Sequence, residues 1–215
     1  MTHLIKICGL STPDAVRLAE QGGATHLGFI FFEKSPRHVS KQLARDLTAE
    51  RDQAKSVAVT VNAPLAELDE IVSVMKPDLL QLHGSESAEQ VQDVQNRYNL
   101  PVIKALSIRE QGDLEKVAIY QEVADFLLLD AKAPPHSELP GGNGVSFDWE
   151  LVTGLISKTP IFLSGGIDQS NVKAAMDQVH SAANSIIGLD VSSGVESAPG
   201  VKDGGKIQAL LDACR

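Results

Sequence analysis

Cysteine is scarce in this chain. Its 215 residues include two cysteines, Cys8 and Cys214, which lie near opposite ends. Neither has a partner at the CxxC spacing of zinc knuckles and redox pairs, and two thiols cannot build a disulfide framework. Proteins with so little cystine potential are typical of reducing compartments. The N-terminus also lacks a long apolar stretch behind a basic start, so we predict a cytoplasmic protein.

Basic residues and long hydrophobic runs are also in short supply. Lys and Arg total 19 against 28 Asp and Glu, which gives a formal net charge of −9. Binding to nucleic acid or to an anionic membrane surface requires a basic face, so neither partner is expected. No apolar run approaches the roughly 18 residues of a membrane span. A small phosphate-bearing ligand remains possible, because a few backbone amides and one Arg can hold it.

Short apolar runs recur along the whole chain. Runs of this kind, rich in β-branched residues and nearly continuous in hydrophobicity, are typical of strands that are covered on both faces. There are eight: Leu4–Ile7, Leu27–Phe32, Val57–Val61, Leu79–Leu82, Val102–Leu106, Phe126–Leu129, Ile161–Leu163 and Ser185–Leu189.

Segments with helical periodicity separate these runs. The first has Thr12 as a candidate N-cap, Pro13 behind it and Gly22-Gly23 at its end. Others begin near Pro64, near Ser85 or Ser87, and near Asp168 or Ser170. Eight strand–helix units of roughly 27 residues predict a compact (β/α)₈ barrel, a fold that usually takes about 250 residues. Residues 1–215 would form this single domain.

A doubly wound open sheet is the alternative architecture. It would normally carry a G-x-G-x-x-G fingerprint after its first strand, where this chain has Cys8-Gly9-Leu10-Ser11. No composition break indicates a linker, and Pro134–Gly144 is interpreted as one long loop. The barrel is therefore favoured.

In such a barrel the chemistry belongs at the carboxyl ends of the strands. The period-2 alternation places Lys6 and Cys8 on the inward row of the first strand, and Asp130 inward at the rim of the sixth. Cys8 could be only a small buried hydrophobe. Together, however, a thiol and a carboxyl across a barrel mouth make a plausible general base and general acid.

The fourth predicted strand carries Gln81 and His83 on its inward face. We interpret His83 as a strand-end histidine that could contact substrate, because the further ligands that a metal site needs are missing. No metal is expected. Lys104 and Lys132 could be Schiff-base nucleophiles, although an internal ion pair is the simpler interpretation.

The last two strands are each followed by small residues that favour anion binding. Gly165 and Gly166 follow the seventh, and Ser192, Ser193 and Gly194 follow the eighth. Backbone N–H groups of these loops can converge on a phosphate, and the recurrent phosphate site of such barrels lies there. Arg37 follows the second strand, where it could be a solvated charge or could bind a carboxylate with two donors.

Seven segments, taken together, resemble phosphoribosylanthranilate isomerase, the (β/α)₈ enzyme of tryptophan biosynthesis. The matches span nearly the whole chain in order, and those at Lys6–Gly9 and Asp190–Glu196 are highly specific. The seven segments are Lys6–Gly9, Gly28–Phe31 with Ser35–Arg37, Gln81–Gly84, Leu128–Asp130, Phe147–Trp149, Ser164–Gly166 and Asp190–Glu196.

The resemblance implies an Amadori rearrangement of N-(5-phosphoribosyl)anthranilate without a cofactor. Asp130 would be the general acid and Cys8 the general base, and Arg37 would face the anthranilate carboxylate. The phosphate would lie on Gly165, Gly166, Ser192, Ser193 and Gly194, with help from the loop near Gly144, and Asp190 would approach a sugar hydroxyl. Ser164 stands where the family pattern leads us to expect Ala, and Gly142-Asn143-Gly144 is a variant glycine-rich loop.

Several alternatives stay open at this point. The chain could be another phosphosugar barrel enzyme, either a metal-dependent epimerase or a Schiff-base aldolase, or it could bind a phosphate ligand without turning it over. The expected ligand is in each case a small phosphoribosyl or phosphosugar molecule. Monomer and homodimer are both compatible with the sequence.

Overall fold

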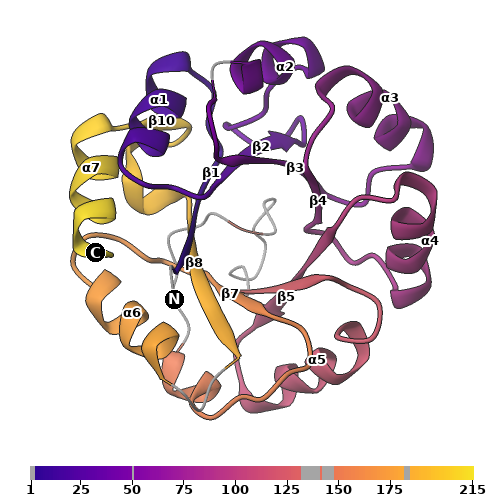
Figure 1. Ribbon diagram of the computed structural model, residues 1–215. Coiled ribbons are helices and arrows are strands. Elements are labelled where there is room, and N and C mark those ends of the chain that lie inside the picture. The colour runs from indigo at the N-terminus through magenta and orange to yellow at the C-terminus, as the bar shows by residue number, and fades with distance from the viewer. Residues whose placement is uncertain (1–2, 50, 132–140, 142–147, 182–184) are drawn as a thin grey trace.

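Eight parallel strands close into a barrel in the computed structural model, in the order β1 to β8, with helices ringing the outside (Figure 1). The structure describes residues 3–49, 51–131, 141, 148–181 and 185–215. The closed (β/α)₈ architecture is the predicted one. The strands are β1 Leu4–Cys8, β2 His26–Phe31, β3 Lys55–Thr60, β4 Leu79–Leu82, β5 Val102–Ile108, β6 Phe126–Ala131, β7 Ile161–Leu163 and β8 Ile186–Val191.

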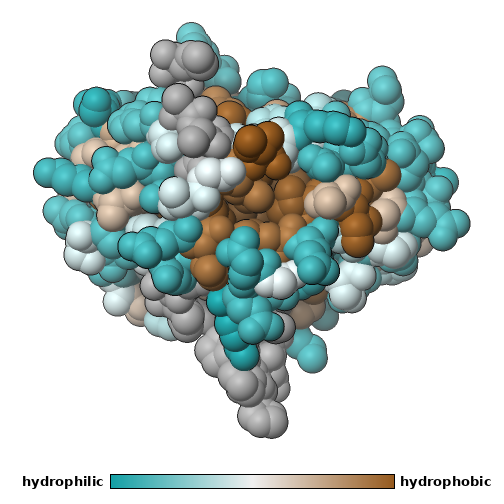
Figure 2. Space-filling model, turned by 90° about the horizontal axis from the view of Figure 1, so that it is seen from below, coloured by the Kyte–Doolittle hydropathy of each residue, from teal (hydrophilic) through white to brown (hydrophobic). Residues whose placement is uncertain are grey.

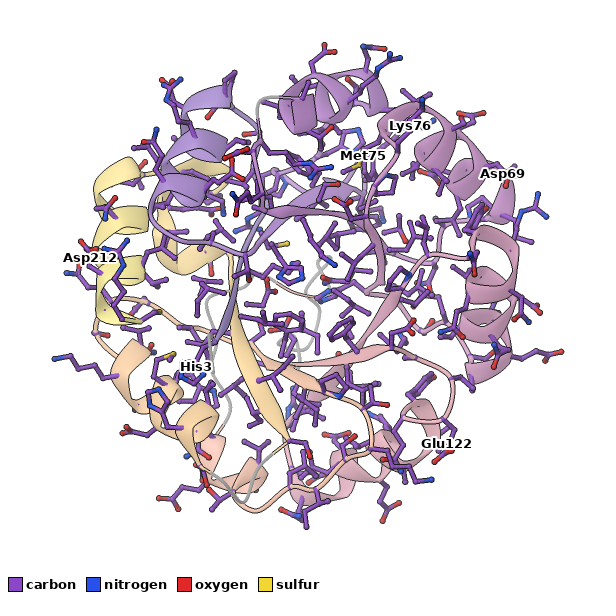
Figure 3. The ribbon with its side chains drawn as sticks, in the orientation of Figure 1. His3, Asp69, Met75, Lys76, Glu122 and Asp212 are labelled. Carbon is purple, nitrogen blue, oxygen red and sulfur yellow. The ribbon has the colours of Figure 1, made fainter. Side chains whose placement is uncertain are left out.

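The outer layer consists of α-helices and short 3₁₀ turns. Charged side chains such as Asp69 and Asp212 lie on this outer ring (Figure 3). The helices are α1 Pro13–Gln21, α2 Lys41–Ala49, α3 Leu65–Met75, α4 Ala88–Tyr98, α5 Glu115–Tyr120, α6 Val172–His180 and α7 Gly204–Ala213, and the 3₁₀ turns are η1 Gln111–Leu114, η2 Trp149–Val152 and η3 Ser193–Val195. None of the helices among the described residues is long and apolar enough to cross a membrane.

Helix ends follow the predicted capping chemistry in most places. Thr12 caps α1, where its hydroxyl accepts from the Ala15 amide at 3.3 Å. Ser87, rather than Ser85, caps α4 in a capping box with Gln90. The helix predicted to start near Asp168 or Ser170 is α6, which begins at Val172 after a turn in which the Asp168 carboxylate accepts the Ser170 amide at 2.7 Å.

Several strands continue beyond their predicted ends. β5, β6 and β8 each extend two residues further, and β1 extends by one. Asp130 and Asp190 therefore lie within paired strands, opposite Ser107 and Lys6 respectively. The hydrophobic pattern missed these residues because it ends where polar side chains begin, although the backbone pairing continues.

The sixth unit departs from the strand–helix pattern. Between β6 and β7 the described residues contain the 3₁₀ turn η2 and no α-helix. After β8 the chain adds a two-stranded antiparallel sheet of β9 Glu196–Ala198 and β10 Val201–Lys202, which was not predicted.

Viewed from below, Figure 2 shows apolar surface gathered near the centre of one face of the molecule.

The buried residues form two clusters that the alternation of side chains separates. Ile5, Ile7, Leu127 and Leu129 pack outward against the helices. Cys8, Leu128 and Phe162, with others, fill the barrel interior. The predicted inward direction of Cys8, and of Asp130 two residues after Leu128, is therefore confirmed.

The barrel interior offers a direct test of the packing. Phe162 is fully buried there, with its ring edge-on to His26 at 5.4 Å between centroids. We expect Phe162→Ala to lower the free energy of unfolding by about 3–5 kcal/mol, because it opens a cavity in a packed core. The matched control is Ile156→Ala, at a side chain 83% exposed, which should change it by no more than about 0.5 kcal/mol. Urea denaturation measures both, and equal losses would contradict a packed interior.

Candidate active site

Asp130 of β6 contacts His83, which directly follows β4. His83 Nε2 lies 3.3 Å from Asp130 Oδ2. The other carboxylate oxygen of Asp130 accepts the Ala131 amide at 3.0 Å. A Cβ built on Gly141 would lie 2.6 Å from both partner atoms of the His83–Asp130 contact. Gly141 therefore packs directly against this pair, and a side chain at this position would displace one of the two groups.

Gln81 supports His83 from inside the barrel. Its amide nitrogen lies 2.8 Å from His83 Nδ1. The side chain is fully buried, and among the described residues its carbonyl oxygen has no hydrogen-bond partner. An unpaired buried acceptor costs about 1–3 kcal/mol. Gln81 was placed on the inward row by its spacing, but nothing in the sequence indicated its contact with His83.

The thiol of Cys8 is buried at the end of β1. Burial raises the pKa of this thiol, and the Asp190 carboxylate acts in the same direction, whereas the Lys6 ammonium lowers it; the net pKa is raised. A Cβ on Gly28 would lie 2.9 Å from Cys8 Sγ and 3.1 Å from Lys6 Nζ, so only glycine leaves room for both groups. A raised pKa leaves only a small thiolate fraction at neutral pH.

Lys6 and Asp190 form a buried ion pair across the seam where β1 meets β8. Lys6 Nζ lies 2.8 Å from Asp190 Oδ1, and both side chains are almost completely shielded from solvent. Burial disfavours the ammonium, but Asp190 and Cys8 outweigh it, so the pKa of Lys6 is raised and the group stays charged. Asp190 thus holds Lys6 beside Cys8, a link that the sequence did not reveal.

Arg37 is buried and forms an ion pair with a carboxylate of the protein itself. Its Nε and Nη2 donate to the two carboxylate oxygens of Glu196 at 2.7 and 2.8 Å. Lys202 Nζ donates to the same carboxylate at 2.8 Å and to the Ser192 carbonyl at 2.8 Å. Burial raises the pKa of Glu196, but Arg37 and Lys202 outweigh it and the net pKa is lowered. Glu196 and Lys202 were not among the predicted site residues, and the link from Glu196 to Arg37 spans 159 positions of sequence.

The two predicted phosphate loops lie against each other. Gly165 and Gly166 both have positive φ, at 93° and 63°, a conformation that glycine adopts without strain. A Cβ on Gly194 would lie 1.9 Å from the Ile167 carbonyl oxygen, so the loops after β7 and β8 are in close contact. Ser192 Oγ donates to the Cys8 carbonyl at 3.1 Å, and Ser193 begins η3. Gly144 lies outside the described residues.

Of the two lysines considered as Schiff-base nucleophiles, the structure describes one. Lys104 pairs with Glu86 at 2.8 Å and donates to the carbonyls of Leu82 and Gly84, which is the predicted internal ion pair. Lys132 lies outside the described residues. No group of three or more His, Cys, Asp or Glu that could hold a metal ion occurs in the described part of the chain.

Comparison with known proteins gives a consistent family. The family model described as N-(5'-phosphoribosyl)anthranilate (PRA) isomerase matches residues 5–213. The N-(5'-phosphoribosyl)anthranilate isomerase of Rhizobium rhizogenes is 53% identical over 210 residues, which cover 97% of this chain and 92% of the relative.

Solved structures of this family superpose on the whole barrel. One contains monomers generated from the dimeric isomerase of Thermotoga maritima, with a TM-score of 0.83 and 30% identity over 99% of this chain and 98% of that one. Another isomerase, in complex with reduced 1-(o-carboxyphenylamino)-1-deoxyribulose 5-phosphate, has a TM-score of 0.83 and 29% identity, with the same coverage. Because the family model covers almost the entire chain, this chain belongs to the phosphoribosylanthranilate isomerase family.

Proposed function

We propose that this chain catalyses the isomerisation of N-(5-phosphoribosyl)anthranilate with Asp130 as general acid and Cys8 as general base. The overall reaction is the aldose–ketose isomerisation of tryptophan biosynthesis that defines the family. The observation that carries the residue assignment is that both groups lie on inward rows of the same closed barrel, at the carboxyl ends of β1 and β6.

The first step opens the ribose ring. Asp130 gives its proton to the ring oxygen while the C1–O bond breaks, and the anthranilate nitrogen supplies the electron pair that forms the Schiff base. A general acid of this kind typically contributes 10²–10⁴-fold to the rate. The contact with His83 and the cover of Gly141 keep the Asp130 carboxyl out of bulk water.

The second step moves a proton from C2. The Cys8 thiolate removes it, and the electron pair of the C–H bond becomes the C1–C2 double bond of an enolamine, which then tautomerises to the ketone 1-(2-carboxyphenylamino)-1-deoxyribulose 5-phosphate. Lys6 lies beside the thiol and stabilises its charged form. The substrate's own nitrogen accepts the electrons, so the proposed route uses no cofactor.

The remaining contacts bind the two ends of the substrate. Glu196 orients the Arg37 guanidinium, which we place against the anthranilate carboxylate. The phosphate would lie between the Gly165-Gly166 loop and the Ser192–Gly194 loop, with Gly144 contributing and with Asp190 near a sugar hydroxyl. His83 would contact the substrate from the Asp130 side.

The proposed surroundings of the protein follow from the same features. A small phosphoribosyl substrate is the ligand, with no nucleic acid or membrane partner, and the cell compartment is the cytoplasm. The relative from Thermotoga maritima is described as dimeric. For this chain the proposal is a monomer or a homodimer, which light scattering in solution distinguishes.

Substitution of the two catalytic groups tests the roles. Cys8→Ala and Asp130→Asn should each lower kcat at least about 10²-fold, because each removes one proton-transfer group. Fluorescence of the anthranilate moiety follows the reaction. Cys214→Ala, which removes the other cysteine, is the control and should keep the full kcat. A large fall in Tm with little change in kcat would show that these are packing residues and would overturn the assignment.

Substitution of Arg37 tests the carboxylate contact. Arg37→Lys keeps the charge but loses the two-donor pair with Glu196 that orients it toward the substrate carboxylate, so KM should rise about tenfold or more while kcat changes less. Arg97→Lys is the matched control, because Arg97 makes the same two-donor pair with Asp69 on the surface. With a phosphoribosyl aniline that lacks the carboxylate, Arg37→Lys and the parent protein should have similar KM. An equal loss with both substrates would contradict the assignment.

A further inference from the structure

Gln81 occupies an unusual position for an amide. It lies on the inward row of β4, fully buried, opposite Val59 of β3 and Ile103 of β5 in the strand register. Those neighbours belong to the apolar filling of the barrel, as does Leu79 two residues earlier. A methionine or leucine would fill this space without the cost of burying a carboxamide. The amide therefore requires an explanation beyond packing.

Only one of the two polar atoms of the Gln81 carboxamide has a hydrogen-bond partner among the described residues. Its nitrogen lies 2.8 Å from His83 Nδ1, and its oxygen has no partner among the described residues. In this arrangement Nδ1 accepts, so the single proton of the neutral ring is on Nε2, which faces Asp130 Oδ2 at 3.3 Å. This state suits an ionised Asp130.

To act as a general acid, Asp130 must also be able to carry a proton. When the Asp130–His83 pair takes up one proton, Nδ1 carries a hydrogen if the ring is charged or if the Asp130 carboxyl donates its hydrogen to Nε2. Nδ1 then needs an acceptor. Rotation of the Gln81 carboxamide by 180° brings its unpaired oxygen to Nδ1 in a space of the same shape.

We propose that Gln81 is a positioning residue for acid catalysis. Its amide donates a hydrogen bond to His83 Nδ1 when the Asp130–His83 pair lacks the additional proton. It accepts a hydrogen bond from Nδ1 when the pair holds the proton that opens the ribose ring. This inference rests on the proposed role of Asp130. Gln81 itself does not touch the substrate. It acts through His83 on the proton that Asp130 delivers.

Two buried ion pairs account for the other charged groups of the barrel strands that the structure describes near the pair. Lys104 and Glu86 are joined to each other beside β5, and Lys6 is joined to Asp190 across the barrel, next to Cys8. These pairs fix the surrounding charge, so a change at Gln81 should act on His83 through the direct contact at Nδ1.

Two near-isosteric substitutions should act in opposite directions. Gln81→Glu keeps the acceptor and adds a negative charge at Nδ1, so the pH midpoint at which His83 takes up a proton should rise by about 1–3 units. Gln81→Met removes both the donor to the unprotonated Nδ1 and the acceptor for the protonated one. Because the hydrogen bond from a charged ring is the stronger of the two, the midpoint should fall. NMR titration of the ¹⁵N-histidine-labelled full chain measures both, with His83→Asn used to assign the His83 signals.

The kinetics must change together with the titration. Gln81→Met should lower kcat about tenfold, which is less than the 10²–10⁴-fold that a general acid typically contributes. KM should stay within about twofold of the parent value. If Gln81 served packing alone, Gln81→Met would leave the His83 midpoint unchanged. Equal midpoints in the three proteins, or an unchanged kcat in Gln81→Met, would overturn the inference. If Gln81→Met does not fold, Gln81→Leu, which also replaces the amide with an apolar side chain, takes its place in both measurements.

Asp130→Asn distinguishes this inference from the proposed function. Full kcat in Asp130→Asn would overturn the acid role of Asp130, and the role of Gln81 with it. A large loss in Asp130→Asn, together with Gln81 variants that behave like the parent protein, would overturn only the role of Gln81.

Discussion

Closure of the barrel is the constraint on which the active site depends. Because β1 pairs with both β2 and β8, every strand has two neighbours and its side chains must point either into the barrel or toward the helices. Alternation then aligns Cys8 and Lys6 on one inward row, and Gln81 with Leu79 on another. A shift of one residue in either strand would turn these groups outward. Register thus decides which polar groups can meet.

Burial of charge in matched pairs follows from that arrangement. Lys6 with Asp190, Lys104 with Glu86, and Arg37 with Glu196 and Lys202 are all shielded from water. Such pairs stabilise little in net terms, because desolvation offsets much of their attraction, but loss of one partner is expensive. We interpret them as positional constraints. The first holds a cation beside Cys8, and the last joins the loop after β2 to the segment after β8.

Local patterns in the sequence were sufficient for most of the fold. Apolar runs located all eight strands, and the Thr12-Pro13 start of α1 was predicted from capping chemistry alone. The same patterns could not foresee η2 in place of a helix, or the small β9–β10 sheet, because few periodic residues define them. In the site, the inward direction of Cys8 and Asp130 followed from alternation. The Arg37–Glu196 pair joins residues 159 positions apart, which no local pattern encodes.

The proposed division of labour between Asp130 and Cys8 is tested most directly by single-turnover kinetics with substrate deuterated at ribose C2. In Cys8→Ala, removal of the C2 proton should limit the rate, so the deuterium isotope effect should be fully expressed. In Asp130→Asn, ring opening should limit the rate, and the isotope effect should disappear. The same isotope effect in both variants would contradict the assignment of separate acid and base steps to these two residues.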